Sequence, residues 1–308
     1  MNQEQFWKSA TELLEREKQL VMMVVTASEG SSPGRAGFWM AVGQSEILGS
    51  IGGGTMEYRF IQQARDGLYS HRIFQQEVVH ELESASSSGM ICSGSQTLAV
   101  IWVEDSSLPL LERICAAYEK NEIHKICLSE AGLELDASRE NMWYSEVIGC
   151  ADTLYIIGGG HVSLAISAIM PSLGFKVIVY DNRPVVSTME ANLFADEKQV
   201  IDYQDVADYI PEGKHVFVAI MTFGHFQDMQ VLQALLHKKV AYLGMMASRA
   251  KKAEVFAALH KEGCSAQLLE AVHCPIGLTI KSHTPAEIAI SIAAEIISVK
   301  NGGEITHS

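Results

Sequence analysis

The sequence predicts an α/β protein in which a Rossmann-like, doubly wound parallel sheet follows an N-terminal α+β domain. A glycine-rich turn lies between two short apolar runs within residues 153–181, and apolar runs alternate with helical patterns beyond it. The length of 308 residues makes two domains the natural expectation. We expect the boundary near Gly149, which gives an N-terminal domain of residues 1–149 and a Rossmann-like domain of residues 150–308.

Each element of the second domain follows from a local pattern. The apolar run at 153–157 predicts a buried parallel strand, residues 162–173 have a helical pattern, and residues 176–180 predict the next strand. Further strands are expected at 199–201, 215–220 and 240–245, with helical patterns after the last two. Such alternation indicates a parallel sheet, which binds ligands beyond the carboxyl ends of its strands.

The turn GGGHVS at 158–163 is a dinucleotide fingerprint, G-x-G-x-x-G, with Ser163 in the third glycine position. Gly158 allows the tight turn, and Gly160 lets the backbone approach a pyrophosphate. A small residue at 163 lets the helix pack on its strand. The N-terminus of that helix offers free N–H groups to a phosphate.

Three side chains near the turn are candidate ligand contacts. Asp181 ends the second strand, where such folds place an acid on a ribose hydroxyl. His161 either faces solvent or contacts an anionic ligand beside the phosphate site. Arg183 either pairs with Asp181 or meets a second phosphate.

Two further segments follow predicted strands, at 222–228 and 248–252. His225 and Asp228 are three residues apart and could share a helix face, as hydrogen-bond partners or as ligand contacts. Arg249 belongs to the densest basic cluster of the chain. It is either part of a solvated helix face or a phosphate clamp at a helix start.

The first domain contains a second glycine loop. Gly52, Gly53 and Gly54 precede a helix that should begin near Thr55, and their N–H groups could form an anion nest. The alternative is a tight strand-to-helix connection without a ligand. The remaining predicted elements are helices at 3–17 and 107–120, strands at 20–27, 38–42, 47–51, 75–82, 97–103 and 124–128, and a hairpin between 132 and 149.

Composition narrows the class of protein. The net charge of −14 argues against a nucleic-acid partner or an anionic membrane surface, and no apolar run is long enough to span a membrane. The six cysteines include no C-x-x-C pair, and no signal peptide is evident, so we expect a cytoplasmic protein with free thiols. No Ser-His-Asp, HExxH or paired-carboxylate signature identifies an acid or base for turnover.

The last helix is predicted to begin at Thr284-Pro285-Ala286-Glu287, which is a capping box with proline at the first helical position. The following IAISIAAEIISVK is apolar nearly all round. We therefore expect this helix to be buried between the sheet and another surface.

Several motifs in one order resemble the XdhC/CoxI family of xanthine dehydrogenase accessory proteins. The resemblance covers nearly the whole chain, and Glu57 matches the family glutamate after the first glycine loop. GMICSGS at 89–95 resembles a Cys-Gly-Gly segment, with Ser93 in the first glycine position, and Lys281 stands where glycine is usual. The other matching segments are SSPGRAG at 31–37, GSIGGGTMEYR at 49–59, GGGHVS at 158–163, DNRP at 181–184, TFGHFQD at 222–228, LGMMASRAKK at 243–252 and PIGLTIKSHTPAEIAISIAAEII at 275–297.

The resemblance implies a non-catalytic maturation factor. Such proteins bind the molybdenum cofactor (molybdopterin), promote its sulfuration with a cysteine desulfurase, and deliver it to a xanthine-dehydrogenase-type molybdoenzyme. It also suggests a homodimer. The fingerprint and Asp181 leave an NAD(P)-dependent oxidoreductase as the alternative, and a nucleotide-sensing regulator as a third interpretation.

Cys92 is the candidate metal contact. It lies in a loop rich in glycine and serine and matches the family cysteine, and molybdenum binds sulfur ligands. We expect Cys92 to contact the molybdenum end of the cofactor while the two glycine loops hold the remainder. The alternative is an inert structural thiol.

Overall fold

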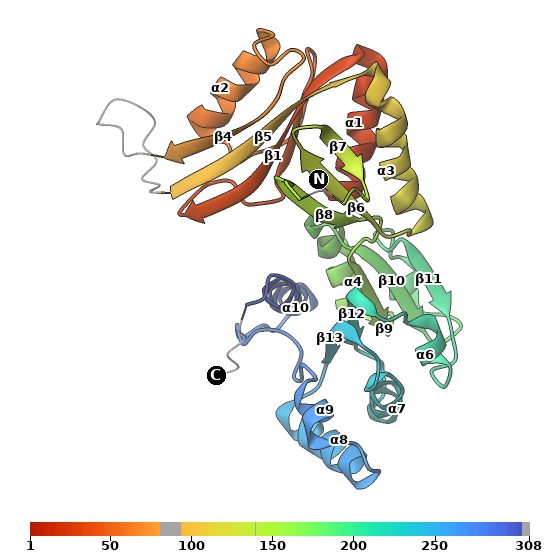
Figure 1. The fold of residues 1–308 in the computed structure, drawn as a ribbon. Coiled ribbons are helices and arrows are strands. Elements are labelled where there is room, and N and C mark those ends of the chain that lie inside the picture. The colour runs from red at the N-terminus through yellow and green to blue at the C-terminus, as the bar shows by residue number, and fades with distance from the viewer. Residues whose placement is uncertain (81–93, 139, 304–308) are drawn as a thin grey trace. The chain divides into compact units, whose positions relative to one another are not determined.

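The computed structural model describes residues 1–80, 94–138 and 140–303. The chain forms two compact units, Met1–Cys150 and Ala151–Ser308 (Figure 1), a division one residue beyond the expected Gly149. Each unit has its own sheet and its own hydrophobic cores.

The main sheet of the first unit is antiparallel, with strand order β3-β2-β1-β5-β4, and helices cover both of its faces. Alternate residues of its central strand enter different cores: Leu20, Met22 and Val24 lie with α1 and α3, while Val21, Met23 and Val25 lie with α2. Burial on both faces explains why this strand is a continuous apolar run. The elements are α1 (Gln3–Glu17), β1 (Gln19–Gly30), β2 (Trp39–Val42), β3 (Ile47–Gly49), α2 (Gly54–Arg65), β4 (Ile73–His80), β5 (Gly94–Glu104), the 3-10 turn η1 (Asp105–Ser107) and α3 (Leu108–Lys120).

A second, three-stranded sheet completes this unit. It consists of β6 (His124–Ser129), β7 (Gly132–Leu135) and β8 (Tyr144–Ile148), in the order β7-β6-β8. The predicted hairpin between 132 and 149 is therefore wrong, because β7 and β8 each pair with β6 and not with one another. The apolar side chains of β6 are buried, which favours the central position for this strand.

The sheet of the second unit is entirely parallel, in the order β11-β10-β9-β12-β13, which confirms the predicted Rossmann-like fold. One face packs against α4 and α10, and the other packs against α7, α8 and α9 (Figure 1). The elements are β9 (Thr153–Ile157), α4 (His161–Ile169), the 3-10 turn η2 (Met170–Leu173), β10 (Lys176–Asp181), α5 (Ser187–Glu190), β11 (Glu197–Val200), α6 (Val206–Tyr209), β12 (Gly213–Ile220), α7 (His225–Leu235), β13 (Val240–Met245), α8 (Arg249–Lys261), α9 (Ala266–Glu270) and α10 (Pro285–Lys300).

Helix α10 begins at the predicted capping box, in which Thr284 and Glu287 bond each other's backbone N–H groups. One face of the helix, including Ala289 and Ile292, is buried in the core with α4. Ile290 of the same helix is 54% exposed, so within this chain α10 is buried on one face only, against the core with α4. Within the described ranges, no helix is both long and apolar enough to cross a membrane.

A half-buried carboxylate ties the smaller sheet of the first unit to α1 and β2. Glu146 on β8 accepts hydrogen bonds from Gln3 (2.7 Å) and Tyr144 (2.9 Å) at Oε2. Its Oε1 accepts from the indole N–H of Trp39 at 2.7 Å. Burial raises the pKa of Glu146 above its ordinary value, although the three donors act in the opposite direction.

Replacing Tyr144 with phenylalanine removes one of these donors and keeps the ring. We expect Tyr144→Phe to lower the free energy of unfolding by about 1–2 kcal/mol at pH 7, because the bond is made to a charged acceptor. The lost donor favours ionised Glu146, so its removal raises the folded-state pKa further. The loss in free energy of unfolding caused by Tyr144→Phe should therefore become smaller as the pH falls towards about 4, where Glu146 is protonated.

Urea denaturation followed by tryptophan fluorescence at several pH values measures this effect. Tyr58→Phe is the matched control, since Tyr58 is exposed on α2. A deficit that is the same at pH 4 and pH 7, or equal to that of the control, would contradict the assignment.

Candidate functional site

The three glycines between β9 and α4 have different surroundings. Gly158 has φ +115°, and a Cβ there would lie 2.3 Å from the carbonyl oxygen of Met221. A Cβ on Gly159 would lie 2.9 Å from the Met189 side chain. Gly160 has φ −76°, and a Cβ there would meet nothing within 4 Å. The first two glycines are thus required by the fold, whereas the third borders open space.

That open space lies at the start of α4, where Gly160 is the N-cap residue and provides no side-chain cap. By contrast, the Ser248 side chain caps α8 and the Thr284 side chain caps α10. In the first turn of α4, the buried hydroxyl of Ser163 has no hydrogen-bond partner among the described residues. The N–H groups of a first helical turn also lack intrahelical acceptors, so this helix start can bind an anion.

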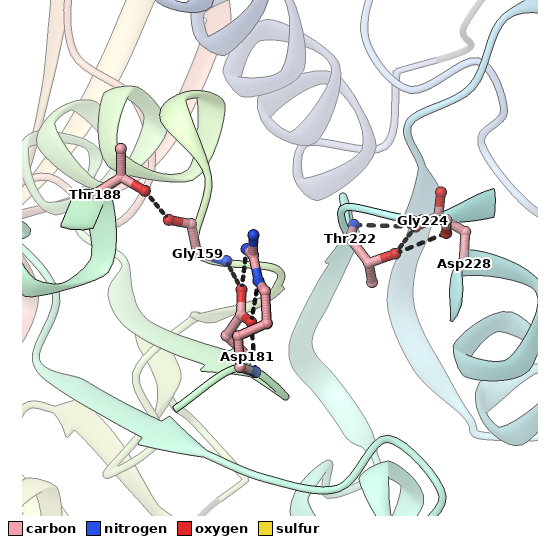
Figure 2. A network of polar contacts seen from close by, with 7 residues as sticks. Gly159, Asp181, Thr188, Thr222, Gly224 and Asp228 are labelled. Carbon is pink, nitrogen blue, oxygen red and sulfur yellow. Dashed lines mark hydrogen bonds and ion pairs between the residues drawn. The ribbon is translucent and has the colours of Figure 1, made fainter. Parts of the chain in front are cut away.

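Asp181 at the end of β10 organises the turn (Figure 2). It is fully buried, and its Oδ2 accepts the backbone N–H of Gly159 at 2.7 Å. Arg183 donates three more bonds, from its backbone N–H (2.9 Å) and from Nε (2.9 Å) and Nη2 (2.7 Å) of its guanidinium. Burial acts to raise the pKa of Asp181, but these bonds outweigh it and hold the pKa below its ordinary value.

Of the two alternatives for Arg183, the structure therefore shows pairing with Asp181. The predicted contact between Asp181 and a ribose hydroxyl would have to compete with four internal hydrogen bonds. In this arrangement the carboxylate fixes the turn and the guanidinium.

A second buried carboxylate organises the loop after β12. Asp228 is 1% exposed, and its Oδ1 accepts the backbone N–H (3.0 Å) and the hydroxyl (2.6 Å) of Thr222 (Figure 2). Its Oδ2 pairs with Lys251 in the first turn of α8. His225 contacts Glu254 of α8 at 3.2 Å. The segments 222–228 and 248–252 are thus joined at the carboxyl edge of the sheet, as their positions after strands predicted.

Arg249, the candidate phosphate clamp, is exposed, whereas Lys251 of the same basic cluster carries the ion pair with Asp228. The N-cap position of Ser248 is the sequence signal for this placement: its side chain accepts from the Lys251 N–H at 3.2 Å, which puts Lys251 third in the first turn of α8.

The glycine loop of the first unit is bonded from within. Oε2 of Glu57 accepts the N–H groups of Ile51 (2.8 Å) and Gly53 (2.9 Å) and the hydroxyl of Ser50 (2.6 Å). Of the donors expected to form an anion nest, the N–H of Gly53 thus bonds a carboxylate of the same chain, and the N–H of Gly52 bonds the Ser50 hydroxyl at 3.1 Å. Gly52 is required by the fold, because a Cβ would lie 2.6 Å from the backbone nitrogen of Gly34.

Gln96 also shapes this loop, and no sequence signal pointed to it. The side chain is buried, and its Oε1 accepts from the hydroxyl of Ser32 (2.8 Å) and the N–H of Gly34 (3.1 Å). Its Nε2 donates to the carbonyl of Ile51 at 3.0 Å. One side chain thus joins the segments 31–37 and 49–54.

The other predicted contacts are dispersed. His161 is exposed at the start of α4, and Gly54 begins α2. Cys92 lies outside the described residues. Among the residues that the structure does describe, no cluster of three histidine, cysteine or carboxylate side chains could hold a metal ion. A cleft of about 440 Å³ in the second unit, lined in part by Lys252, His273 and Cys274, contains none of the predicted contacts.

Fold and site together define a protein of two α/β units whose second unit is of the Rossmann type, with one glycine of its turn facing open space. Residues 154–296 match the XdhC Rossmann domain, and residues 13–76 match the XdhC and CoxI family. The chain belongs to the XdhC and CoxI family.

The relatives that the chain resembles are distant. It is 25% identical over 304 residues to the uncharacterized protein YqeB of Escherichia coli (strain K12), a match that covers 95% of this chain and 46% of YqeB. It is 25% identical over 149 residues to a protein of Bacillus subtilis (strain 168) described as a probable xanthine dehydrogenase subunit, covering 48% of this chain and 42% of that protein. The chain thus spans less than half the length of either curated relative.

A solved structure resembles the whole chain. It is a crystal structure from Bacillus halodurans described as a xanthine dehydrogenase, with a TM-score of 0.78 and 21% identity. The match covers 100% of this chain and 98% of the other. At this identity the likeness establishes the shared fold.

The Asp228–Lys251 pair can be tested by removing its cation. We expect Lys251→Met to lower the free energy of unfolding by about 2–3 kcal/mol, because a buried carboxylate loses its countercharge. Lys261→Met, on the exposed surface of the same helix, is the matched control and should change it by less than about 0.5 kcal/mol. Chemical denaturation measures both, and equal effects of the two substitutions would refute the structural role of Lys251.

Proposed function

We propose that the chain is an accessory protein that binds the molybdenum cofactor at the carboxyl edge of the second unit's sheet. One observation carries this proposal: the open space at Gly160, beside a helix start without a side-chain cap. A terminal phosphate of molybdopterin fits such a place, because first-turn N–H groups and the helix dipole both favour an anion. When bound, the cofactor supplies the molybdenum, and the residues of this chain hold its phosphate.

Family membership supports the same function. The Bacillus subtilis relative is described as a probable xanthine dehydrogenase subunit, which favours a xanthine-dehydrogenase-type molybdoenzyme as the client. We propose further that the chain acts in the cytoplasm, supports sulfuration with a cysteine desulfurase, and forms a homodimer. The exposed Ile290 on α10 is consistent with a partner surface. Cys92 is proposed from its sequence context to contact the molybdenum.

The alternative, an NAD(P)-dependent oxidoreductase, depends on Asp181 as a ribose acceptor. That carboxylate is fully buried and accepts four internal hydrogen bonds. Ribose binding would have to break bonds that fix the turn itself. A ligand anchored by its phosphate needs no such change, and this difference favours the molybdenum cofactor.

The proposal predicts that a side chain at position 160 blocks phosphate while the fold persists. We expect Gly160→Val to weaken molybdopterin binding at least tenfold, because charge-assisted hydrogen bonds to the phosphate are lost. Its stability should fall by no more than about 1 kcal/mol, the cost of a poorer N-cap residue. Gly160→Ala should show a smaller loss of affinity.

Equilibrium binding and thermal denaturation on the same preparations measure the two effects. Ser172→Val is the control, an exposed change at the far end of the same helical segment. If Gly160→Val folds and binds molybdopterin as tightly as the unmodified chain, the phosphate site is not at this turn.

A further inference from the structure

Two phenylalanine side chains are exposed to solvent at the carboxyl edge of the second unit's sheet. Phe223 is 84% exposed and Phe226 is 72% exposed. The loop that carries Phe223 is held on both sides: Thr222 is bonded to Asp228, and the Thr222 hydroxyl contacts the carbonyl of Gly224 at 3.1 Å. Exposure of Phe223 is therefore a fixed feature of this edge (Figure 2 shows the loop).

Arg183 lies against this ring, with its Cζ 5.3 Å from the centroid of Phe223. The guanidinium cannot turn freely, because Nε and Nη2 are bonded to Asp181. Arg183 follows β10 and Phe223 follows β12, and these strands flank β9. The contact therefore spans the end of β9, the strand that leads into the glycine turn.

Arg183 and Phe223 do not present a net charge to a ligand. The positive charge of Arg183 is already balanced by the buried Asp181, and Phe223 has none. What remains is an exposed phenyl ring with a guanidinium held against it, on the same edge of the sheet as the open space at Gly160. Guanidinium and aromatic planes both stack on planar heterocycles.

We propose that Arg183 and Phe223 form a stacking platform for the planar heteroaromatic ring of the ligand whose phosphate lies at Gly160. This inference rests on the proposed function, because it assigns the ring of the same ligand. The ligand class is a phosphate-bearing heterocycle, which includes both a pterin and a purine nucleotide. Phe223 supplies the aromatic contact to that ring.

The test measures dissociation constants for three probes, namely molybdopterin, ADP and inorganic pyrophosphate, with the full chain and three variants. Phe223→Ala should weaken binding of the matching ring-bearing probe about tenfold. It should leave the affinity for pyrophosphate unchanged. Phe223→Tyr should retain full affinity. Phe194→Ala, which removes another exposed phenylalanine of this unit, should have no effect.

The outcomes of this test distinguish the stacking platform from the proposed function. If molybdopterin binds Phe223→Ala as tightly as the unmodified chain, the platform is refuted and the proposed function stands. If ADP alone binds and depends on Phe223, the platform stands and the proposed function fails. An equal loss of pyrophosphate affinity would show that Phe223 acts through the loop, and absence of any ring binding would refute both claims.

Discussion

The buried carboxylate of Asp181 is the interaction on which the functional edge depends. Its bonds to the Gly159 N–H and to Arg183 connect the end of β10 to the turn after β9. With the turn fixed, Gly158 and Gly159 pack tightly and Gly160 is left beside open space. With the guanidinium fixed, Cζ of Arg183 lies over the Phe223 ring, 5.3 Å from its centroid. The open space at Gly160 and the contact between Arg183 and Phe223 thus both depend on Asp181.

Both units use the same device. In each, a carboxylate of the chain binds N–H groups of a glycine loop: Asp181 bonds Gly159, and Glu57 bonds Gly53. The two loops differ in which N–H groups the carboxylate bonds. Neither helix start has a side-chain cap, but the N–H of the N-cap Gly53 is bonded to Glu57, whereas Asp181 bonds the N–H of Gly159, one residue before the N-cap Gly160. This difference directs the functional argument to the second unit.

Local patterns predicted much of the fold. The strand at 153–157, the parallel sheet and the capping box at Thr284 follow from periodicity and from short-range chemistry, and the structure contains all three. The pairing of β7 and β8 with β6 did not follow, because strand pairing depends on tertiary packing and not on the turn sequence. For the same reason the sequence left the pairing of Arg183 with Asp181 as one of two alternatives and did not identify Thr222 and Lys251 as the partners of Asp228. Gln96 was missed because a lone glutamine has no periodic signal.

We propose that this edge of the second unit's sheet binds the molybdenum cofactor in preference to a nicotinamide dinucleotide. The most direct measurement is a side-by-side titration of the apo chain with molybdenum cofactor and with NAD by isothermal calorimetry. The account predicts saturable, roughly stoichiometric binding of the molybdenum cofactor, and affinity for NAD that is weaker by at least a hundredfold, about 2.7 kcal/mol. Tight binding of NAD with no binding of the molybdenum cofactor would contradict it.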